Sequence, residues 1–269
     1  MRIGVISDIH IDRNKAYPVT EVLAEKTKEK KLDCLLLAGD VSNRYKTTFA
    51  FFERFAGLTD VPFYFVPGNH DLWDEAGEYG DTREIYRRYA EHPRCLSGRC
   101  VPLGGGWAAV GETGWYDHSF GNPKFSPEEF ARHSMYGRTW MDSVNTRWHA
   151  DDRQVHREML ARLERSLAEG TAAGSKLIAV THVVGIRAFL VPETRGKWDY
   201  FNAFLGSPDY GELYRRCNVR YGVMGHVHFR RTHMQDGIRF VCACLNYFTE
   251  WRTGDVGKEI DDALSVLTL

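Results

Sequence analysis

Short polar motifs that directly follow apolar runs carry the residues best able to do chemistry in this chain. Seven of these residues are Asp, Asn or His, and none is Cys: Asp8, His10, Asp40, Asn69, His182, His226 and His228. Carboxylate and amide oxygens, combined with imidazole nitrogens, suit borderline divalent ions such as manganese, iron or zinc. A structural zinc site would instead close its shell with four ligands, usually thiolates. The set is too large for one closed shell and indicates an open, hydrolytic site for two metal ions with one shared carboxylate.

The elements that must position these residues begin with alternating strands and helices. Short apolar runs predict strands over residues 2–7, 33–38 and 61–66, with amphipathic helices between them, which is a βαβαβ start. Parallel strands joined by right-handed crossovers end at one edge of a sheet, where α/β proteins build their sites. Asp8, Asp40 and Asn69 each follow one of these strands, so we expect them to converge on that edge.

The second half of the chain repeats this pattern and then turns antiparallel. We expect a helix over residues 152–169 and strands at 107–112, 176–180, 221–224, 231–234, 238–245 and 263–267. The tripeptide Gln235-Asp236-Gly237 lies between two of these strands and is a good hairpin signal. His182 and His226 each follow a predicted strand end. The chain is therefore expected to be an α/β protein with two mixed β-sheets and outer helices.

Two segments do not fit this rhythm. Residues 114–150 and 184–208 are irregular, rich in aromatic residues and in Gly, Pro or Asn, and each begins near a predicted site edge. We interpret them as lid-like insertions that face substrate, with the covering of a sheet or a dimer contact as the equal alternative. No repeat or linker divides the chain, so residues 1–269 are expected to form one domain. Nothing in the sequence indicates an oligomeric state.

Charge and hydrophobicity narrow the classes of partner. The formal net charge is −1 and acidic and basic residues are interspersed, so no broad basic field is expected to hold a nucleic acid. Met1 and Arg2 run straight into the first predicted strand, which leaves no room for a signal peptide. No apolar stretch approaches the ~20 residues needed to cross a bilayer. We therefore expect a cytoplasmic protein that binds neither a membrane nor an extended nucleic acid.

The order of the motifs closely resembles that of the calcineurin-like metallophosphoesterases. The shared pattern is Asp-x-His, Gly-Asp, Gly-Asn-His-Asp, a lone His and Gly-His-x-His, and it spans Asp8 to His228. The resemblance implies a four-layer sandwich of two mixed β-sheets flanked by helices. It also implies two metal sites that share Asp40, one formed by Asp8, His10, Asp40 and His228 and the other by Asp40, Asn69, His182 and His226.

The chemistry of such a pair of ions agrees with the resemblance. Two neighbouring cations repel each other unless anionic ligands lie between them, so Asp40 and a hydroxide are natural bridges. The hydroxide forms near neutral pH and can attack phosphorus in line, while both ions neutralise charge on the non-bridging oxygens. We therefore expect a phosphoesterase with two divalent ions, which can be manganese, iron or zinc, with manganese favoured.

Three further residues are expected to act on the substrate. By the resemblance, His70 faces the leaving oxygen as general acid, and Asp71 orients its imidazole. Asn43 and Arg44 stand where some relatives have an acidic residue and a phosphate-binding Arg. Asn replaces the acid here, so only Arg44 keeps the match and is expected to bind a phosphoryl oxygen. An exposed residue at a helix start is an equally good interpretation of Arg44.

The expected substrate is a small phosphate ester, with phosphodiesters favoured. A monoester needs extra cations near its terminal oxygens, and Arg44 is the one plausible cation that the sequence offers. A diester instead needs His70, because its leaving group is poor. A phosphomonoesterase or a nuclease of the same fold remains the enzymatic alternative. A non-catalytic binding or scaffold protein is the alternative from another class, and it is disfavoured because all seven ligands and His70 are retained.

Overall fold

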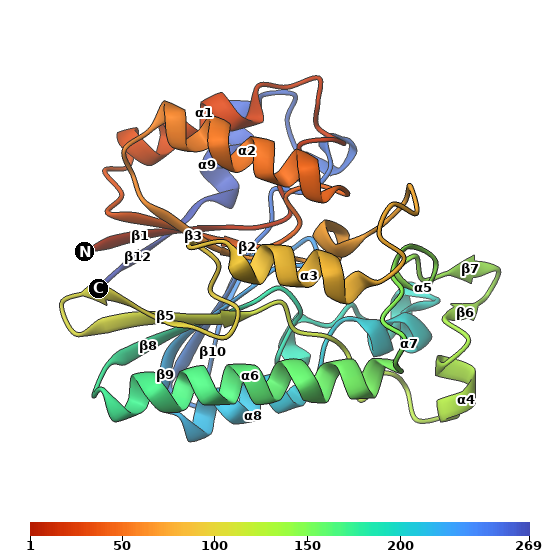
Figure 1. The fold of residues 1–269 in the computed structure, drawn as a ribbon. Helices are drawn as coiled ribbons and strands as arrows, with labels where there is room; N and C mark the ends of the chain where they lie inside the picture. Colours follow the sequence, from red (N-terminus) through yellow and green to blue (C-terminus); the bar gives the residue numbers. More distant parts are fainter.

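Two β-sheets stack face to face between layers of helices in the computed structural model, which describes all residues from Met1 to Leu269 (Figure 1). The first sheet has the order β12-β1-β2-β3, with strands β1 (Arg2–Ile6), β2 (Cys34–Ala38), β3 (Phe63–Val66) and β12 (Ser265–Thr268). The second has the order β10-β11-β9-β8-β5-β4, with strands β4 (Cys100–Gly104), β5 (Trp107–Glu112), β8 (Lys176–Thr181), β9 (Val219–Met224), β10 (Arg230–Gln235) and β11 (Ile238–Ala243). The expected four-layer sandwich is confirmed.

Both sheets are mixed, and their central strands are parallel. β1, β2 and β3 pair in parallel, as do β5, β8, β9 and β11, whereas β12, β4 and β10 pair antiparallel at the edges. The predicted hairpin between β10 and β11 is present, and its turn residues Asp236 and Gly237 have φ of 52° and 76°. Positive φ at both positions is what a tight two-residue hairpin turn requires. The parallel strands end on the same side of the molecule.

Helices cover the outer faces of both sheets (Figure 1). Those over the first sheet are α1 (Val19–Glu29), α2 (Tyr45–Leu58) and α9 (Val256–Ala263). Those over the second are α6 (Asp152–Ala172) and α8 (Pro208–Arg216), and α3 (Thr82–Glu91) lies between the two groups in this view. None of the helices combines the length and the apolar character needed to cross a membrane.

Each central strand points alternate side chains into the core between the two sheets and into the core between its own sheet and the helices. Ile3 and Val5 of β1 belong to a buried cluster between the sheets that also contains Val180 of β8 and Val223 of β9. Ile6 of β1 instead packs toward the helices. This period of two is the expected consequence of a strand buried on both faces.

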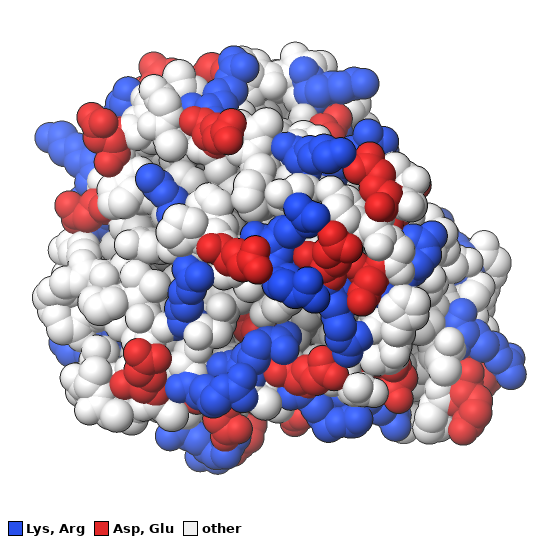
Figure 2. Space-filling view, viewed as in Figure 1, with Lys and Arg blue, Asp and Glu red and all other residues white.

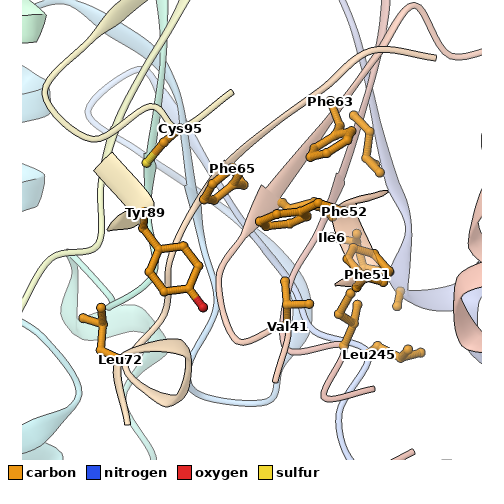
Figure 3. Packing of buried hydrophobic residues seen from close by; sticks show 14 of the residues in the cluster. Ile6, Val41, Phe51, Phe52, Phe63, Phe65, Leu72, Tyr89, Cys95 and Leu245 are labelled. Carbon is orange, nitrogen blue, oxygen red and sulfur yellow. The ribbon is translucent and has the colours of Figure 1, made fainter. Parts of the chain in front are cut away.

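Aromatic packing holds α2 against the first sheet. Phe52 lies between Phe63 and Phe65 of β3, with ring centroids 5.3 and 4.3 Å away (Figure 3). All three rings are at most 3% exposed, and full burial of a Phe contributes roughly 1.5–3 kcal/mol. The packing therefore fixes β3, whose end leads into the Gly-Asn-His-Asp motif.

The two irregular segments form the end of the molecule opposite the chain termini (Figure 1). Residues 114–150 contain four short elements, namely α4 (Pro127–Phe130), β6 (Ser134–Met135), β7 (Arg138–Thr139) and α5 (Asp142–Asn145). Residues 184–208 contain α7 (Trp198–Phe201) and the 3-10 turns η2 (Arg187–Phe189), η3 (Glu193–Arg195) and η4 (Asn202–Phe204). Two more such turns, η1 (His70–Leu72) and η5 (Phe248–Glu250), lie near the ends of β3 and β11.

Candidate active site

The seven candidate ligands meet at the edge where the parallel strands of both sheets end. Asp8, Asp40 and Asn69 follow β1, β2 and β3 of the first sheet, while His182 and His226 follow β8 and β9 of the second. Ligand-type atoms within 4.8 Å of one another form two groups, Asp8 with His10 and His228, and Asp40 with His182 and His226, and a third group of His10, Asp40 and His70 overlaps both. The structure therefore brings together side chains from both halves of the sequence.

The separations between these atoms suit shared ions. His182 Nε2 and His10 Nε2 lie 3.3 and 3.7 Å from Asp40 Oδ2, and His228 Nε2 lies 3.6 Å from Asp8 Oδ1. Ligand bonds of about 2 Å put two atoms on the same ion roughly 3–4 Å apart. These atoms are too far apart for good hydrogen bonds but well spaced for a common cation.

His10 gives the sharpest test of whether the site fits a metal. Both of its ring nitrogens are buried without a hydrogen-bond partner, and the residue is 0% exposed. Burial, together with the neighbouring His70 and His228, lowers the pKa of His10 well below its usual value. An unpartnered polar group in such a place costs about 1–3 kcal/mol. A neutral imidazole held there is what a divalent ion needs as a ligand, so the donor set fits the two-metal expectation.

Three other imidazoles have one nitrogen bound to an acceptor outside the site. His182 Nδ1 donates to the Ala38 carbonyl at 2.8 Å, and His226 Nε2 donates to the Phe204 carbonyl at 3.1 Å. His228 Nδ1 lies 2.7 Å from a carboxylate oxygen of Glu250. Such contacts orient the ring and leave the opposite nitrogen facing the site, as they do for most metal-binding histidines.

The backbone of the site is held in an uncommon conformation. Five of the seven candidate ligands have left-handed φ values between 38° and 71°, namely Asp8, His10, Asp40, His226 and His228. Such residues cost of order 1–3 kcal/mol each and gather at functional sites. Neighbouring glycines make room for them, because a Cβ at Gly68 would clash with the Asp40 side chain and a Cβ at Gly225 would clash with the Asp8 side chain.

Protonation of the metal-free site centres on Asp40 and His182. Burial raises the pKa of Asp40 from 3.8 to about 7, although His182 opposes this rise. Burial alone would lower the pKa of His182, but the carboxylates of Asp40 and Asp8 raise it to about 10. At pH 7 without metal, His182 therefore carries a proton on the nitrogen that faces Asp40.

Metal uptake near pH 7 should therefore release protons. A divalent ion can bind His182 only after Nε2 has lost its proton, and Asp40 is also partly protonated at pH 7, so the apparent metal affinity should rise between about pH 6 and 9, with at least one proton released per protein at pH 7. Calorimetric titration of metal-free protein with manganese, in two buffers of different ionisation enthalpy, measures this release. An affinity that falls as the pH rises would contradict the assignment of His182 as a ligand.

His70 stands beside Asp40 and faces the same space. Its Nε2 lies 3.9 Å from Asp40 Oδ2, its backbone N–H donates to Asp40 Oδ1 at 2.9 Å, and its side chain is 15% exposed. The ring stacks on Trp73 with centroids 3.8 Å apart. Burial and the neighbouring histidines lower the pKa of His70 well below its usual value, so the ring is neutral at pH 7 until an anion approaches it.

The partner of His70 is Asn43 and not Asp71, which corrects the expected role of the aspartate. His70 Nδ1 lies 2.9 Å from Asn43 Oδ1, and Asn43 Nδ2 donates to Glu75 at 3.0 Å, which fixes the direction of the amide. Asp71 instead uses its buried carboxylate to accept hydrogen bonds from Val41 N, Ser42 N, Gly68 N and Thr48 Oγ1. Asp71 therefore joins the two loops that carry Asp40 and His70 and does not touch the imidazole.

The expected role of Arg44 also needs correction. Its side chain is exposed at the start of α2, and the residue does not line the cavity that contains Asp40 and His70. That cavity has a volume of about 1260 Å³ and is lined by six other basic residues: Arg13, Lys15, Arg138, Arg195, Lys197 and Arg252. The sequence argument against a monoester assumed that Arg44 was the one cation near the site, and that assumption does not hold.

Both irregular segments contribute to the wall of this cavity. Trp140 comes from the first segment, and Trp198 and Phe201 come from the second. Trp115 and Tyr116 of the first segment are each 1% exposed and pack inside the protein. The segments thus lie over the candidate site, with some aromatic rings facing the cavity and others in the core beneath.

Comparison with known proteins agrees with this geometry. The sequence model of the calcineurin-like phosphoesterase family matches residues 1–230. The chain is 26% identical over 276 residues to the acyl-carrier-protein phosphodiesterase PptH of Mycobacterium tuberculosis, covering 93% of this chain and 79% of that protein. The crystal structure of that phosphopantetheinyl hydrolase superposes with a TM-score of 0.75 at 22% identity, covering 93% of this chain and 91% of the other.

Two more distant structures share the fold alone. The protein TT1561 of Thermus thermophilus has a TM-score of 0.56 at 15% identity, covering 98% of this chain and 97% of the other. A dimetal phosphatase from Danio rerio has a TM-score of 0.53 at 9% identity, covering 90% of this chain and 86% of the other.

Proposed function

Because the chain belongs to the calcineurin-like phosphoesterase family and is a hydrolase of phosphoric esters, we propose that it cleaves a phosphodiester that joins a phosphopantetheine-type arm to an acidic carrier protein. The observation that carries the proposal is the convergence of seven ligand-type side chains, Asp40 among them, with His70 beside them, at the floor of a large cavity with basic residues around it. The names of the similar Mycobacterium tuberculosis protein supply the substrate class.

The proposed metal sites follow the two groups of side chains. One ion would be held by Asp8, His10 and His228, the other by Asn69, His182 and His226, with Asp40 shared. Two divalent ions bound there would activate a water as nucleophile and neutralise charge on the phosphoryl oxygens. Manganese is the favoured ion, because oxygen and imidazole ligands without thiolates suit it.

His70 is proposed as the general acid. The approach of an anionic phosphate beside Nε2 favours the protonated imidazole, and Asn43 accepts the Nδ1 proton and so supports that form. The leaving group of the proposed diester is an alkoxide, which is a poor leaving group and needs a proton. The protein residue that supplies it must lie beside the shared carboxylate, as His70 does.

The cavity wall suits the two sides of such a substrate. Trp140, Trp198 and Phe201 offer apolar surface to a thin arm. Arg138 and Arg195 are exposed and have no acidic partner, so they are available to an acidic protein surface. Elsewhere, the face that carries α3 and α6 shows basic and acidic residues intermixed (Figure 2), as the net charge of −1 suggests.

Charge reversal at the rim tests the substrate class. The double variant Arg138→Glu/Arg195→Glu should raise KM for a phosphopantetheinylated acidic carrier roughly 5- to 30-fold, because each rim charge contributes on the order of 1 kcal/mol or less. KM for bis(p-nitrophenyl) phosphate should change much less. The matched control is Arg87→Glu/Arg165→Glu, which makes the same charge change on α3 and α6, away from the cavity. The substrate class is wrong if the wild type releases no arm from the carrier while it hydrolyses the small diester.

A further inference from the structure

One buried carboxylate of the first irregular segment, residues 114–150, reaches into the candidate site. This segment is called the insertion below. Asp142, the first residue of α5, is 1% exposed and accepts four hydrogen bonds, none of them from a cation. Oδ1 accepts from Asn69 Nδ2 and Trp73 Nε1, both at 2.7 Å. Oδ2 accepts from Trp140 Nε1 at 2.9 Å and Tyr116 OH at 3.3 Å. The carboxylate thus connects the insertion to two residues of the Gly-Asn-His-Asp loop region.

The bond to Asn69 decides which end of its amide faces the site. Asp142 can only accept from Nδ2, so Oδ1 is turned toward His182, where it lies 2.9 Å from Nε2. An amide oxygen can bind a cation, but an amide nitrogen has no lone pair to give. Without the carboxylate, the amide is free to rotate and present the wrong atom.

The bond to Trp73 acts on the second functional group. The indole of Trp73 stacks on the ring of His70, with an interplanar angle of 28°. The same carboxylate oxygen that holds Asn69 fixes this indole through Nε1. Asp142 therefore sets the position of a candidate ligand and of the surface against which the candidate acid rests.

We propose that Asp142 is a positioning residue that makes metal binding at the Asn69 position conditional on the docked insertion. The inference deepens the proposed function, because it concerns the regulation of the same site. When the insertion moves away, it takes the carboxylate with it, and both the amide of Asn69 and the indole of Trp73 lose their partner. The insertion would thus act on the chemistry and not only on access to the cavity.

A second carboxylate next to the same region, which is 12% exposed, provides the contrast. Asp152, at the start of α6, accepts from Trp115 Nε1 at 2.8 Å and lies 2.9 and 2.6 Å from the Nε2 atoms of His118 and His133. These are hydrogen bonds that anchor the insertion, and none of the three partners touches a candidate ligand of the two-metal site. Loss of Asp152 should therefore lower the unfolding temperature of the protein, while in the folded state the insertion stays docked through Asp142 and the orientation of Asn69 is unchanged.

The test compares three variants by manganese titration and by thermal unfolding of the metal-free protein. Asp142→Ala should lower the affinity for one of the two ions about 10- to 100-fold and leave the affinity for the other unchanged. A loss of this size is typical when the hydrogen-bond partner of a metal ligand is removed. Asp142→Asn should recover much of this loss, because its amide oxygen can still accept from Asn69 and Trp73. Asp152→Asn should lower the unfolding temperature while both affinities stay at their wild-type values.

A double-variant comparison separates positioning from general damage. In an Asn69→Ala background, Asp142→Ala should cause no further loss of metal affinity, because the ligand that it orients is already gone. Wild-type affinity for both ions in Asp142→Ala, or a further loss in the Asn69→Ala background, would overturn the proposal. If the metal results hold but the wild type hydrolyses no diester, the proposed function fails and the role of Asp142 stands.

Discussion

Replacing Asp40 with alanine should remove both metal ions and lower turnover roughly 1000-fold or more. The carboxylate is central to both ligand groups, since His182, His10 and His70 all have Nε2 within 3.9 Å of Oδ2. Without the shared anion, nothing offsets the repulsion between the two cations, so they should no longer bind. The transition state then loses several kcal/mol of stabilisation. Metal analysis after gel filtration and turnover of bis(p-nitrophenyl) phosphate measure the two effects together.

The loss should reflect the site and not the fold. Folding raises the pKa of Asp40 from 3.8 to about 7, so the folded state binds the proton more tightly and the metal-free protein loses stability as the pH rises through that window. Asp40→Asn removes the buried charge. At pH 8 and without metal, its unfolding temperature should therefore be no lower than that of the wild type. His10→Ala should release one ion and keep the other. Retention of both ions in Asp40→Ala would disprove the shared carboxylate.

Replacing His70 with alanine should slow turnover in proportion to how poor the leaving group is. With an alkyl leaving group the loss should be about 10²- to 10⁴-fold, the usual contribution of a general acid, and with p-nitrophenol it should be about tenfold or less. The side chain of His70 forms its hydrogen bond with Asn43, which is not a candidate ligand, and its Nε2 comes no closer to the Asp40 carboxylate than 3.9 Å. The metal content should therefore stay at the wild-type level. Rates for a series of aryl and alkyl diesters measure the dependence on leaving-group pKa.

A matched control and a rescue sharpen this test. His233→Ala removes an exposed imidazole from β10 and should change none of the rates. Added imidazole should restore part of the turnover of His70→Ala with alkyl diesters, because it can supply the missing proton. The same rate loss for good and poor leaving groups would show that His70 positions the substrate and does not protonate it.

The strands that carry candidate ligands could be predicted from the sequence, because each is a short apolar run that ends at a polar residue. β5 was predicted with its observed bounds, and β1, β2 and β8 within one residue at each end. β4 was missed, since Pro102 and Gly104 weaken its pattern and it lies half-exposed at a sheet edge. The helices α3, α8 and α9 were also missed because they are short, 8 to 10 residues, and stand among turn-forming residues.

The residues that orient the candidate ligands were not readable in the same way. Asn43, Asp142 and Glu250 act through hydrogen bonds to a His or an Asn that is distant in the sequence. Asp142 and Glu250 belong to no motif of fixed spacing, and Asp142 lies in a segment without periodicity. The same limit explains the two corrected roles, because the sequence places Asp71 and Arg44 near the site but does not show where their side chains point.

The pairing of β1 with β12 has a consequence for the making of the protein. β1 lies between β2 and β12, so the strand that leads to Asp8 has only one neighbour until residues 265–268 have been synthesised. His226, His228 and Glu250 also emerge from the ribosome late. A nascent chain therefore carries the first four candidate ligands, Asp8, His10, Asp40 and Asn69, before the three later histidines that complete the set have been synthesised. Hydrolytic activity should arise only once residues 265–268 have been synthesised, which keeps shorter nascent chains inert.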